Sequence, residues 1–399
     1  MSFKHYIKLL GNIFISFMGA GILGLPYAFR HAGLLHGSII LVIVCFISVV
    51  GMLTLLDIKN ALIPSKNSDK NPDVEETHDH VELEFREVGQ YAFGSIGLLM
   101  VEVAIVLSQV GFCCAYLIFI TEAIGEYFPQ FPKLCYLVII LIPLFFLVSI
   151  QNLNSLGLFS IFANLITLTA YTIVLASEVD HLLYNEPSNN HQTMFNLTSF
   201  PFFFSVSIYC YEGAGLIFSL ESSPHKSIRH HFRPIFITSM AIITIIYIVF
   251  GACGYLAYGE LTEEIITSNL EGLIPTKVKL FLSVSLLFTY PVMMFPVSII
   301  LDRRLNLTEQ FGSMNILIRT LLVVLTGCII ILIPQFSTLM ELVGATLCTM
   351  LNFIFPGLFY LAIIGKGNGM LSVIKSIGLI VFGVIGMIVG TQDVLRNFL

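Results

Sequence analysis

Long apolar runs recur along the whole of this 399-residue chain, and they decide its fold class. The hydrocarbon core of a bilayer is about 30 Å thick, so a helix needs about 20 apolar residues to cross it. We expect an all-α integral membrane protein with about eleven transmembrane helices, because backbone groups in lipid must be paired within the segment. The segments lie at about 9–29, 38–57, 96–121, 134–150, 155–177, 199–220, 235–257, 279–301, 315–334, 337–364 and 371–392.

Charge is too scarce for a surface exposed to water. Only 11% of the residues are charged and 56% are hydrophobic, whereas about a quarter of a soluble domain is charged. This composition excludes a soluble enzyme. The net charge of −6 comes mainly from residues 64–87, and no basic stripe is present, so nucleic acid is excluded as a partner. The eight cysteines lie in or beside apolar runs without zinc spacing, which indicates packed side chains.

Only residues 58–95 and 178–198 form loops of any length, and neither is large enough to build a core. We therefore interpret residues 1–399 as a single transmembrane domain with an acidic loop at 58–95. If the N-terminus is cytoplasmic, 14 of the 19 Lys and Arg residues fall on the cytoplasmic side. Positive residues are retained on that side, so the charge distribution predicts a cytoplasmic N-terminus and places the C-terminus on the opposite side.

Two of the apolar segments are interrupted where a membrane helix is normally continuous. The first contains GAGIL at 19–23 followed by Pro26, and the sixth contains GAGLI at 213–217. Irregular backbone in lipid costs several kcal/mol per unpaired group, so it persists where it lines a cavity. Five span steps separate the two pentapeptides, and an odd number inverts the second copy relative to the first. Paired breaks in inverted halves are the sequence sign of a transporter's midplane site.

Each break exposes both ends of a helix. A helix N-terminus suits a carboxylate, and the carbonyls of a helix C-terminus suit an ammonium group or a cation. A free amino acid carries both groups. The alternative is that Gly-Ala-Gly only permits close helix packing, as Gly386 to Gly390 in the last segment does in our interpretation. The paired placement, with Pro26 and Glu212 beside the breaks, favours the binding site.

Five motifs resemble the amino acid/auxin permease family, and most closely its vacuolar and proton-coupled amino acid transporters. They are GNIFISFMGAGILGLPYAF (11–29), LSQVGFCCAYLIFI (107–120), YCYEGAGLIFSLE (209–221), GYLAYGE (254–260) and LLFTYPVMMFPVSIILDRR (286–304). The resemblance covers nearly the whole chain apart from the acidic loop. It implies a five-plus-five inverted repeat with one extra C-terminal helix. Some proton-coupled relatives have a histidine early in the first span, whereas Asn12 stands there in this chain.

Two acidic residues lie well inside predicted spans, and such residues are functional hypotheses by default. Glu212, beside the second break, either carries a proton or holds the break by hydrogen bonds. For Glu102 we weigh proton coupling equally against a structural contact with polar backbone. Ser285 and Thr289 lie at the depth where this fold often binds sodium, although back-bonding within their own helix is the slightly favoured alternative. These four residues are the predicted ion-coupling set.

The predicted substrate site consists of the residues about the two breaks and those at the same depth in the third and eighth spans. They are Met18, Gly19, Ala20, Gly21, Ile22, Gln109, Tyr209, Tyr211, Gly213, Ala214 and Tyr290. We expect the substrate carboxylate at Gly19 to Ile22 and the amino group at the second break. No basic residue is expected in this pocket, which favours neutral amino acids over acidic ones.

The sequence thus predicts a secondary active transporter of amino acids that works by alternating access and needs no cofactor. Resemblance favours a proton over sodium as the coupling ion, and a vacuolar, lysosomal or plasma membrane as the location. Its partners are the free amino acid and the lipid bilayer. The alternative from another class is a sensor with a transporter fold, which binds amino acid without net flux. An intramembrane enzyme ranks last, since the chain lacks the His, paired Asp or Ser constellation for that chemistry.

Overall fold

The computed structural model describes residues 2–68, 83–149, 153–184, 193–223, 229–270, 273–305, 312–365 and 369–398, and no strand occurs in these ranges. The helices are α1 (Ser2–Phe17), α2 (Leu25–Ala32), α3 (Leu34–Ser68), α4 (Phe85–Tyr127), α5 (Lys133–Val148), α6 (Leu153–Tyr184), α7 (Phe200–Cys210), α8 (Ile217–Ser222), α9 (Phe232–Tyr258), α10 (Leu273–Arg304), α11 (Gly312–Leu332), α12 (Phe336–Val343), α13 (Phe355–Ile363) and α14 (Met370–Phe398). Short 3-10 turns are η1 (Ala20–Gly24), η2 (Arg229–His231), η3 (Gly259–Leu261) and η4 (Ile266–Ser268), and two π-helical turns join α12 to α13.

Every predicted apolar segment coincides with a helix or a pair of helices. In the described residues, seven helices are long and apolar enough to cross a membrane, and the bent pair α1 and α2 makes an eighth. Three further apolar helices, α5, α7 and the part of α11 from Ile316 to Leu332, are shorter. The all-helical membrane fold is therefore confirmed, while the exact number of crossings stays a prediction.

The predicted loop at 58–95 is wrong at both ends. Helix α3 continues to Ser68, and α4 begins at Phe85, close to the helical lead-in expected from about residue 82. Glu84 caps α4, because its side chain accepts from the backbone of Glu87 while the Glu87 side chain accepts from the backbone of Glu84. The acidic stretch at 69–82 lies outside the described residues.

Helix α4 bends sharply after its first two turns. Gly94 has a φ of 61°, a conformation that side chains disfavour. The bend brings Gly89 against Gly97, where a Cβ on Gly97 would lie 2.0 Å from the carbonyl oxygen of Gly89. The residues before the bend therefore form a separate short arm at the end of the membrane-spanning part of α4.

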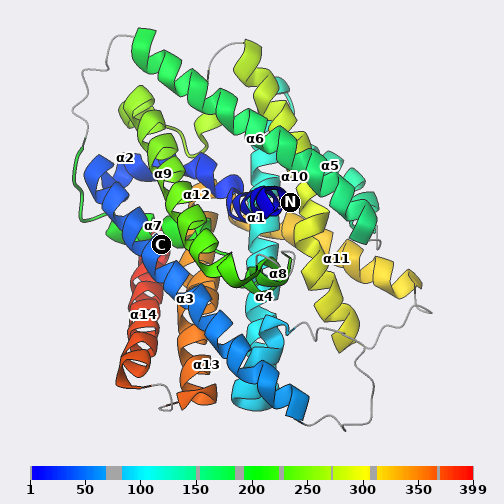
Figure 1. The fold of residues 1–399 in the computed structure, drawn as a ribbon. Coiled ribbons are helices and arrows are strands. Elements are labelled where there is room, and N and C mark those ends of the chain that lie inside the picture. Colours follow the sequence, from blue (N-terminus) through cyan, green and yellow to red (C-terminus); the bar gives the residue numbers. More distant parts are fainter. Residues whose placement is uncertain are drawn as a thin grey trace.

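The helices pack around α4, which runs through the middle of the molecule (Figure 1). Helix α10 packs along both α4 and α6, and α2 packs against α9. Helices α13 and α14 lie side by side at one end of the molecule (Figure 1). Both broken helices, α1 with α2 and α7 with α8, contact α3 or α9, so they share one region of the bundle.

Candidate transport site

The first break lies between Phe17, which ends α1, and Ala20, which begins η1. The helix axes on its two sides differ in direction by 53°. Gly19 precedes η1 in extended conformation, and Pro26 lies in the first turn of α2, where its missing N–H costs no hydrogen bond. Glycine and proline thus interrupt the helix where the sequence predicts it.

The second break separates Cys210, which ends α7, from Ile217, which begins α8. The carboxyl group of Glu212 accepts hydrogen bonds from the backbone N–H groups of Ala214 and Gly215. These hydrogen bonds are the ones that the second of the two roles predicted for Glu212 requires. Its side chain is half-buried, so the carboxyl group is also within reach of the cavity described below.

The two breaks pack directly against each other. A Cβ on Gly21 would lie 3.0 Å from the Cys210 sulfur and 3.1 Å from the Tyr209 ring. A Cβ on Gly213 would lie 2.4 Å from the Phe17 ring, which leaves room only for glycine. The inverted pentapeptides of the sequence are therefore neighbours in space.

Tyrosine hydroxyls donate hydrogen bonds to the carbonyl groups that the breaks expose. The Tyr247 hydroxyl donates to the Phe17 carbonyl at 2.5 Å and lies 3.3 Å from the Cys210 carbonyl, so it joins the ends of α1 and α7. The Tyr171 hydroxyl donates to the Gly19 carbonyl at 3.0 Å. Neither tyrosine stands out in the sequence, because α9 and α6 carry them and only tertiary packing brings them to the breaks.

A cavity of about 310 Å³ ends at the second break. Its deep end is lined by Ser108 and Gln109 of α4 and by Glu212 and Gly215 of the break. Its mouth is lined by charged residues, namely Lys59, Glu84, Arg86 and Arg303. These residues lie on the side that the charge distribution predicts to be cytoplasmic.

The expectation of a pocket without basic residues is wrong for the mouth of the cavity, although no basic residue lines its deep end. Lys59 is paired with Glu221 at 2.7 Å. Arg303 and Arg86 both pair with Glu84, at 3.0 Å and 2.5 Å. Partial burial alone would raise the pKa of Glu84, but hydrogen bonds and charges from the two arginines outweigh it and hold this pKa below its ordinary 4.5.

Glu102 belongs to the same charged group and not to the breaks. Its carboxylate pairs with Arg304 at 2.6 Å and with Arg86 at 3.3 Å. The contact joins α4 to the end of α10. The structural partner expected for Glu102 is polar backbone, whereas the structure provides two arginines.

The predicted sodium ligands have partners within the protein. The Ser285 hydroxyl donates to the Ala163 carbonyl at 2.7 Å and lies 2.6 Å from the Thr167 hydroxyl, which ties α10 to α6. The Thr289 hydroxyl donates to the Ser285 carbonyl at 2.9 Å, within its own helix. Within the described residues, no group of His, Cys, Asp and Glu has the arrangement of a metal site.

The predicted substrate residues fall into two groups. Gln109 lines the cavity, and its Oε1 has no hydrogen-bond partner among the described residues. The Tyr209 hydroxyl also has none there, although Tyr209 does not line this cavity. Other side chains turn into the protein: the Tyr211 hydroxyl donates to Thr244, and the Tyr290 hydroxyl lies 2.7 Å from that of Thr326. The rest pack about the first break or beside Gly213, with Ala20, Gly21, Ile22 and Ala214 buried and Met18 and Gly19 half-buried. Asn12 lies elsewhere, donating to Ser223.

The opposite side of the breaks is covered. Arg30 of α2 pairs with Glu260 at 3.3 Å and donates to the Thr262 carbonyl at 3.1 Å. These contacts hold the segment after α9 over the first break. The structure is therefore open toward the cavity mouth and closed on the far side, which we call the outer side.

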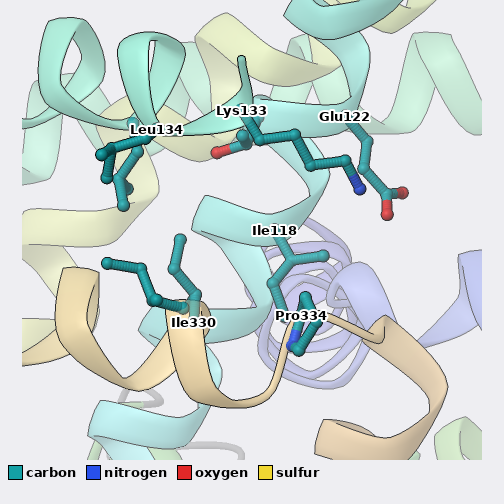
Figure 2. Close-up of a pocket in the computed structure, with 9 residues that line it drawn as sticks. Ile118, Glu122, Lys133, Leu134, Ile330 and Pro334 are labelled. Carbon is teal, nitrogen blue, oxygen red and sulfur yellow. The ribbon is translucent and has the colours of Figure 1, made fainter.

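A second cavity, of about 300 Å³, lies between α4, α5 and α11 on the outer side. Its walls are mostly apolar, and Figure 2 shows Lys133 and Glu122 pointing toward one another at its edge. None of its lining residues belongs to either break, so it is separate from the site described above.

Facing breaks in two membrane helices, beside a cavity open to one side, define a helical transporter with an inverted-repeat fold. A solved structure supports this fold over 97% of the chain and 93% of its own length, with a TM-score of 0.52 and 10% identity. It is Mhp1, a nucleobase-cation-symport-1 family transporter, in a closed conformation with bromovinylhydantoin bound.

The chain belongs to the family of transmembrane amino acid transporter proteins, whose family model matches residues 5–396. Amino acid transporter ANT1 of Arabidopsis thaliana is 32% identical over 97% of the chain and 91% of its own length. Amino acid transporter AVT3C of the same plant is 33% identical over 98% of the chain and 90% of its own length. The protein is therefore a multi-pass membrane transporter and not an enzyme.

Proposed function

We propose that this protein is a proton-coupled transporter of neutral amino acids that works by alternating access. The observation that carries the proposal is the cavity between the charged mouth and the second break, with Gln109 Oε1, which has no hydrogen-bond partner in the described structure, at its deep end. The family supplies the substrate class, and the fold supplies the mechanism: one side opens while the other is closed.

The substrate's carboxylate is held at the first break, between Gly19 and Ile22, by the N-terminal end of the helix that follows. Its ammonium group lies toward the second break, where Gln109 Oε1 and the Tyr209 hydroxyl are acceptors without partners in the described structure. Neutral side chains are favoured because the charges lining the cavity, apart from Glu212, are confined to its mouth and are paired there.

Glu212 is the proposed proton carrier, because it is the acidic side chain that lines the cavity and contacts the broken backbone. Protonation would weaken its hydrogen bonds from Ala214 and Gly215, since a carboxylate is the stronger acceptor. The break would then rearrange as the proton binds. Sodium coupling through Ser285 and Thr289 is the alternative, and it requires both hydroxyls to leave their present partners.

The test is uptake of labelled amino acids into proteoliposomes under an imposed pH or sodium gradient. We expect a pH gradient to drive accumulation of neutral amino acids more strongly than of acidic or basic ones. Binding without accumulation under either gradient would identify a sensor instead. Accumulation that follows only the sodium gradient would replace the proton with sodium.

We further propose that the N-terminus faces the cytosol and that the protein resides in a vacuolar or lysosomal membrane, with the plasma membrane as the alternative. An epitope inserted in residues 66–80 should be accessible from the cytosol, and one after Leu399 only from the opposite side. Both epitopes accessible from one side of sealed membranes would contradict this topology. Fluorescence of a tagged chain distinguishes the two membranes.

A further inference from the structure

A carboxyl group without a partner lies inside the outer half of the bundle. Glu178 of α6 has no exposed surface, and neither of its carboxyl oxygens has a hydrogen-bond partner in the described structure. It lies against α9, where a Cβ on Gly254 would be 2.9 Å from its Oε1 and 2.7 Å from the ring of Pro26 on α2. Glu178 thus packs between the helix that follows the first break and the helix that carries Tyr247.

No charge in the described structure neutralises this group. The thiol of Cys253, on α9, interacts electrostatically with Glu178 but is itself a weak acid. Charged and titratable side chains on the surrounding elements have other contacts, in the pairs Arg30–Glu260, His31–Tyr27, His181–Tyr258, Tyr255–Thr193 and Lys279–Glu126. Burying an ionised carboxylate without a partner is far more costly than protonating it. Glu178 therefore carries a proton in this conformation.

The position of Glu178 connects it to the first break. Tyr171, which donates to the Gly19 carbonyl, lies seven residues earlier on α6, so the two side chains share one face of the helix. Seven residues span about 10 Å along the axis, with Glu178 on the outer side of Tyr171. Only six residues separate it from the end of α6 at Tyr184, which is about 9 Å. Separation of α2 from α9 on the outer side would therefore open a short path for water to the carboxyl group.

We infer that Glu178 is a proton-binding site that exchanges with the outer compartment, and that the bound proton is required for the outer side to close. The inference rests on the proposed alternating access. When the outer side is open, water solvates the carboxylate and the proton leaves or binds according to the outer pH. When it is closed, as in this structure, the carboxyl group is dry and protonated. An acidic outer compartment therefore drives the transporter toward its cytosol-open state.

This role differs from that of Glu212. A proton on Glu212 faces the cavity beside the substrate, whereas a proton on Glu178 acts on the packing of α2 against α9. If closure requires the proton, the ratio of closed to open states changes up to about tenfold for each unit of outer pH. Linkage of this kind needs no movement of the Glu178 proton across the membrane.

The experiment compares Glu178→Gln with Asp180→Asn, an exposed acidic residue on the same helix, in vesicles sorted for one orientation by capture of an N-terminal tag. Exchange of labelled for unlabelled substrate is measured while the pH on the outer side of the protein is varied and the pH on its cytoplasmic side is fixed. We expect wild type and Asp180→Asn to lose exchange steeply as the outer pH rises. Glu178→Gln, which stays neutral, should keep the exchange rate of the acidic wild type within about twofold at every outer pH.

Retention of the wild-type pH dependence in Glu178→Gln would overturn the inference, because a neutral structural role is served equally by glutamine. If Glu178→Gln does not fold, infrared spectra of wild type decide: a protonated-carboxyl band that persists at neutral pH and shifts on isotope labelling of α6 glutamate supports the site, and an ionised-carboxylate band there overturns it. The proposed proton coupling is tested separately. It is wrong if wild type shows no accumulation under a pH gradient while the pH dependence of exchange still requires Glu178.

Discussion

The ring of Phe17, the last residue of α1, occupies the space that a side chain on Gly213 would need. A Cβ on Gly213 would lie 2.4 Å from Cζ and 2.5 Å from Cε1 of that ring. The residue that ends one half of the first broken helix thus fixes the position of the second break. The two breaks cannot move independently, so a change at either one is transmitted to the other.

Gly213→Ala should therefore impair transport more than an exposed glycine substitution. Overpacking in a close-packed interior costs about 1–3 kcal/mol, and here the displaced ring belongs to the other break. We expect at least a tenfold loss of uptake, measured in proteoliposomes that contain equal amounts of protein. The double variant Gly213→Ala with Phe17→Leu should recover part of it, because the smaller side chain makes room.

The matched control is Gly378→Ala in α14, where nothing lies within 4 Å of the added Cβ. It should retain wild-type uptake and gain up to about 1 kcal/mol of helix stability. Equal losses in both variants would show that the contact between Phe17 and Gly213 is unimportant.

Tyr247→Phe should lower the turnover rate, because it removes the hydroxyl that joins the carbonyls of Phe17 and Cys210. The loss of one buried hydrogen bond costs about 1 kcal/mol of stability, and it leaves two helix ends uncoupled. Tyr290→Phe is the comparison, since its hydroxyl contacts Thr326 on α11. We expect a larger fall in kcat for Tyr247→Phe. A larger rise in KM for Tyr290→Phe would instead support the prediction that Tyr290 binds substrate.

Glu212→Gln should abolish accumulation driven by a pH gradient while substrate exchange continues, because glutamine keeps the shape but cannot ionise. Accumulation and exchange are measured in the same proteoliposomes. Thr289→Val is the corresponding test of sodium coupling, since it removes a hydroxyl at the predicted cation site. If pH-driven accumulation survives in Glu212→Gln and sodium dependence is lost in Thr289→Val, the proton assignment is wrong.

The stability that Glu84 contributes at the mouth of the cavity depends on pH in the acidic range. Its pKa is held below 4.5, so its contacts with Arg303 and Arg86 contribute stability that is present above this pH. That contribution is lost as the pH falls through the lowered value, when the carboxylate takes a proton. We expect the melting temperature to fall more steeply below about pH 4.5 in wild type than in Glu84→Gln. Parallel curves would show that the ion pairs are fully screened by solvent.

Much of the fold follows from the sequence because membrane helices are local structures. Lipid offers no hydrogen bonds, so an apolar run of sufficient length must be helical whatever it packs against. The same local rule located both breaks, since glycine and proline interrupt a helix without reference to its neighbours. The same rule predicts the wrong helix end where polar residues continue a helix beyond the apolar run. Helix α6, for example, extends past the end predicted for this segment at residue 177 to Tyr184 and so carries Glu178.

Packing decided which residues meet, and the sequence alone missed several of them. Gly390 was interpreted as a helix-packing residue, and a Cβ there would indeed lie 2.5 Å from the Ser205 hydroxyl, in a contact that sequence cannot place. Glu102 has the pattern of a coupling residue, yet it reaches two arginines that lie 16 and 202 positions away. The partner of a charged residue depends on the arrangement of whole helices, which no local pattern contains.

The sequence by itself determined that this chain is a helical membrane protein, where its helices break, and that the two breaks form an inverted pair. These features depend on the hydrophobicity and backbone preferences of neighbouring residues. The tertiary structure decided that Phe17 lies on Gly213, that Tyr247 bonds both breaks, and that Glu178 is left dry between α2 and α9. Such contacts join residues from distant helices. They are fixed only when close packing of the whole bundle selects one relative position for each helix.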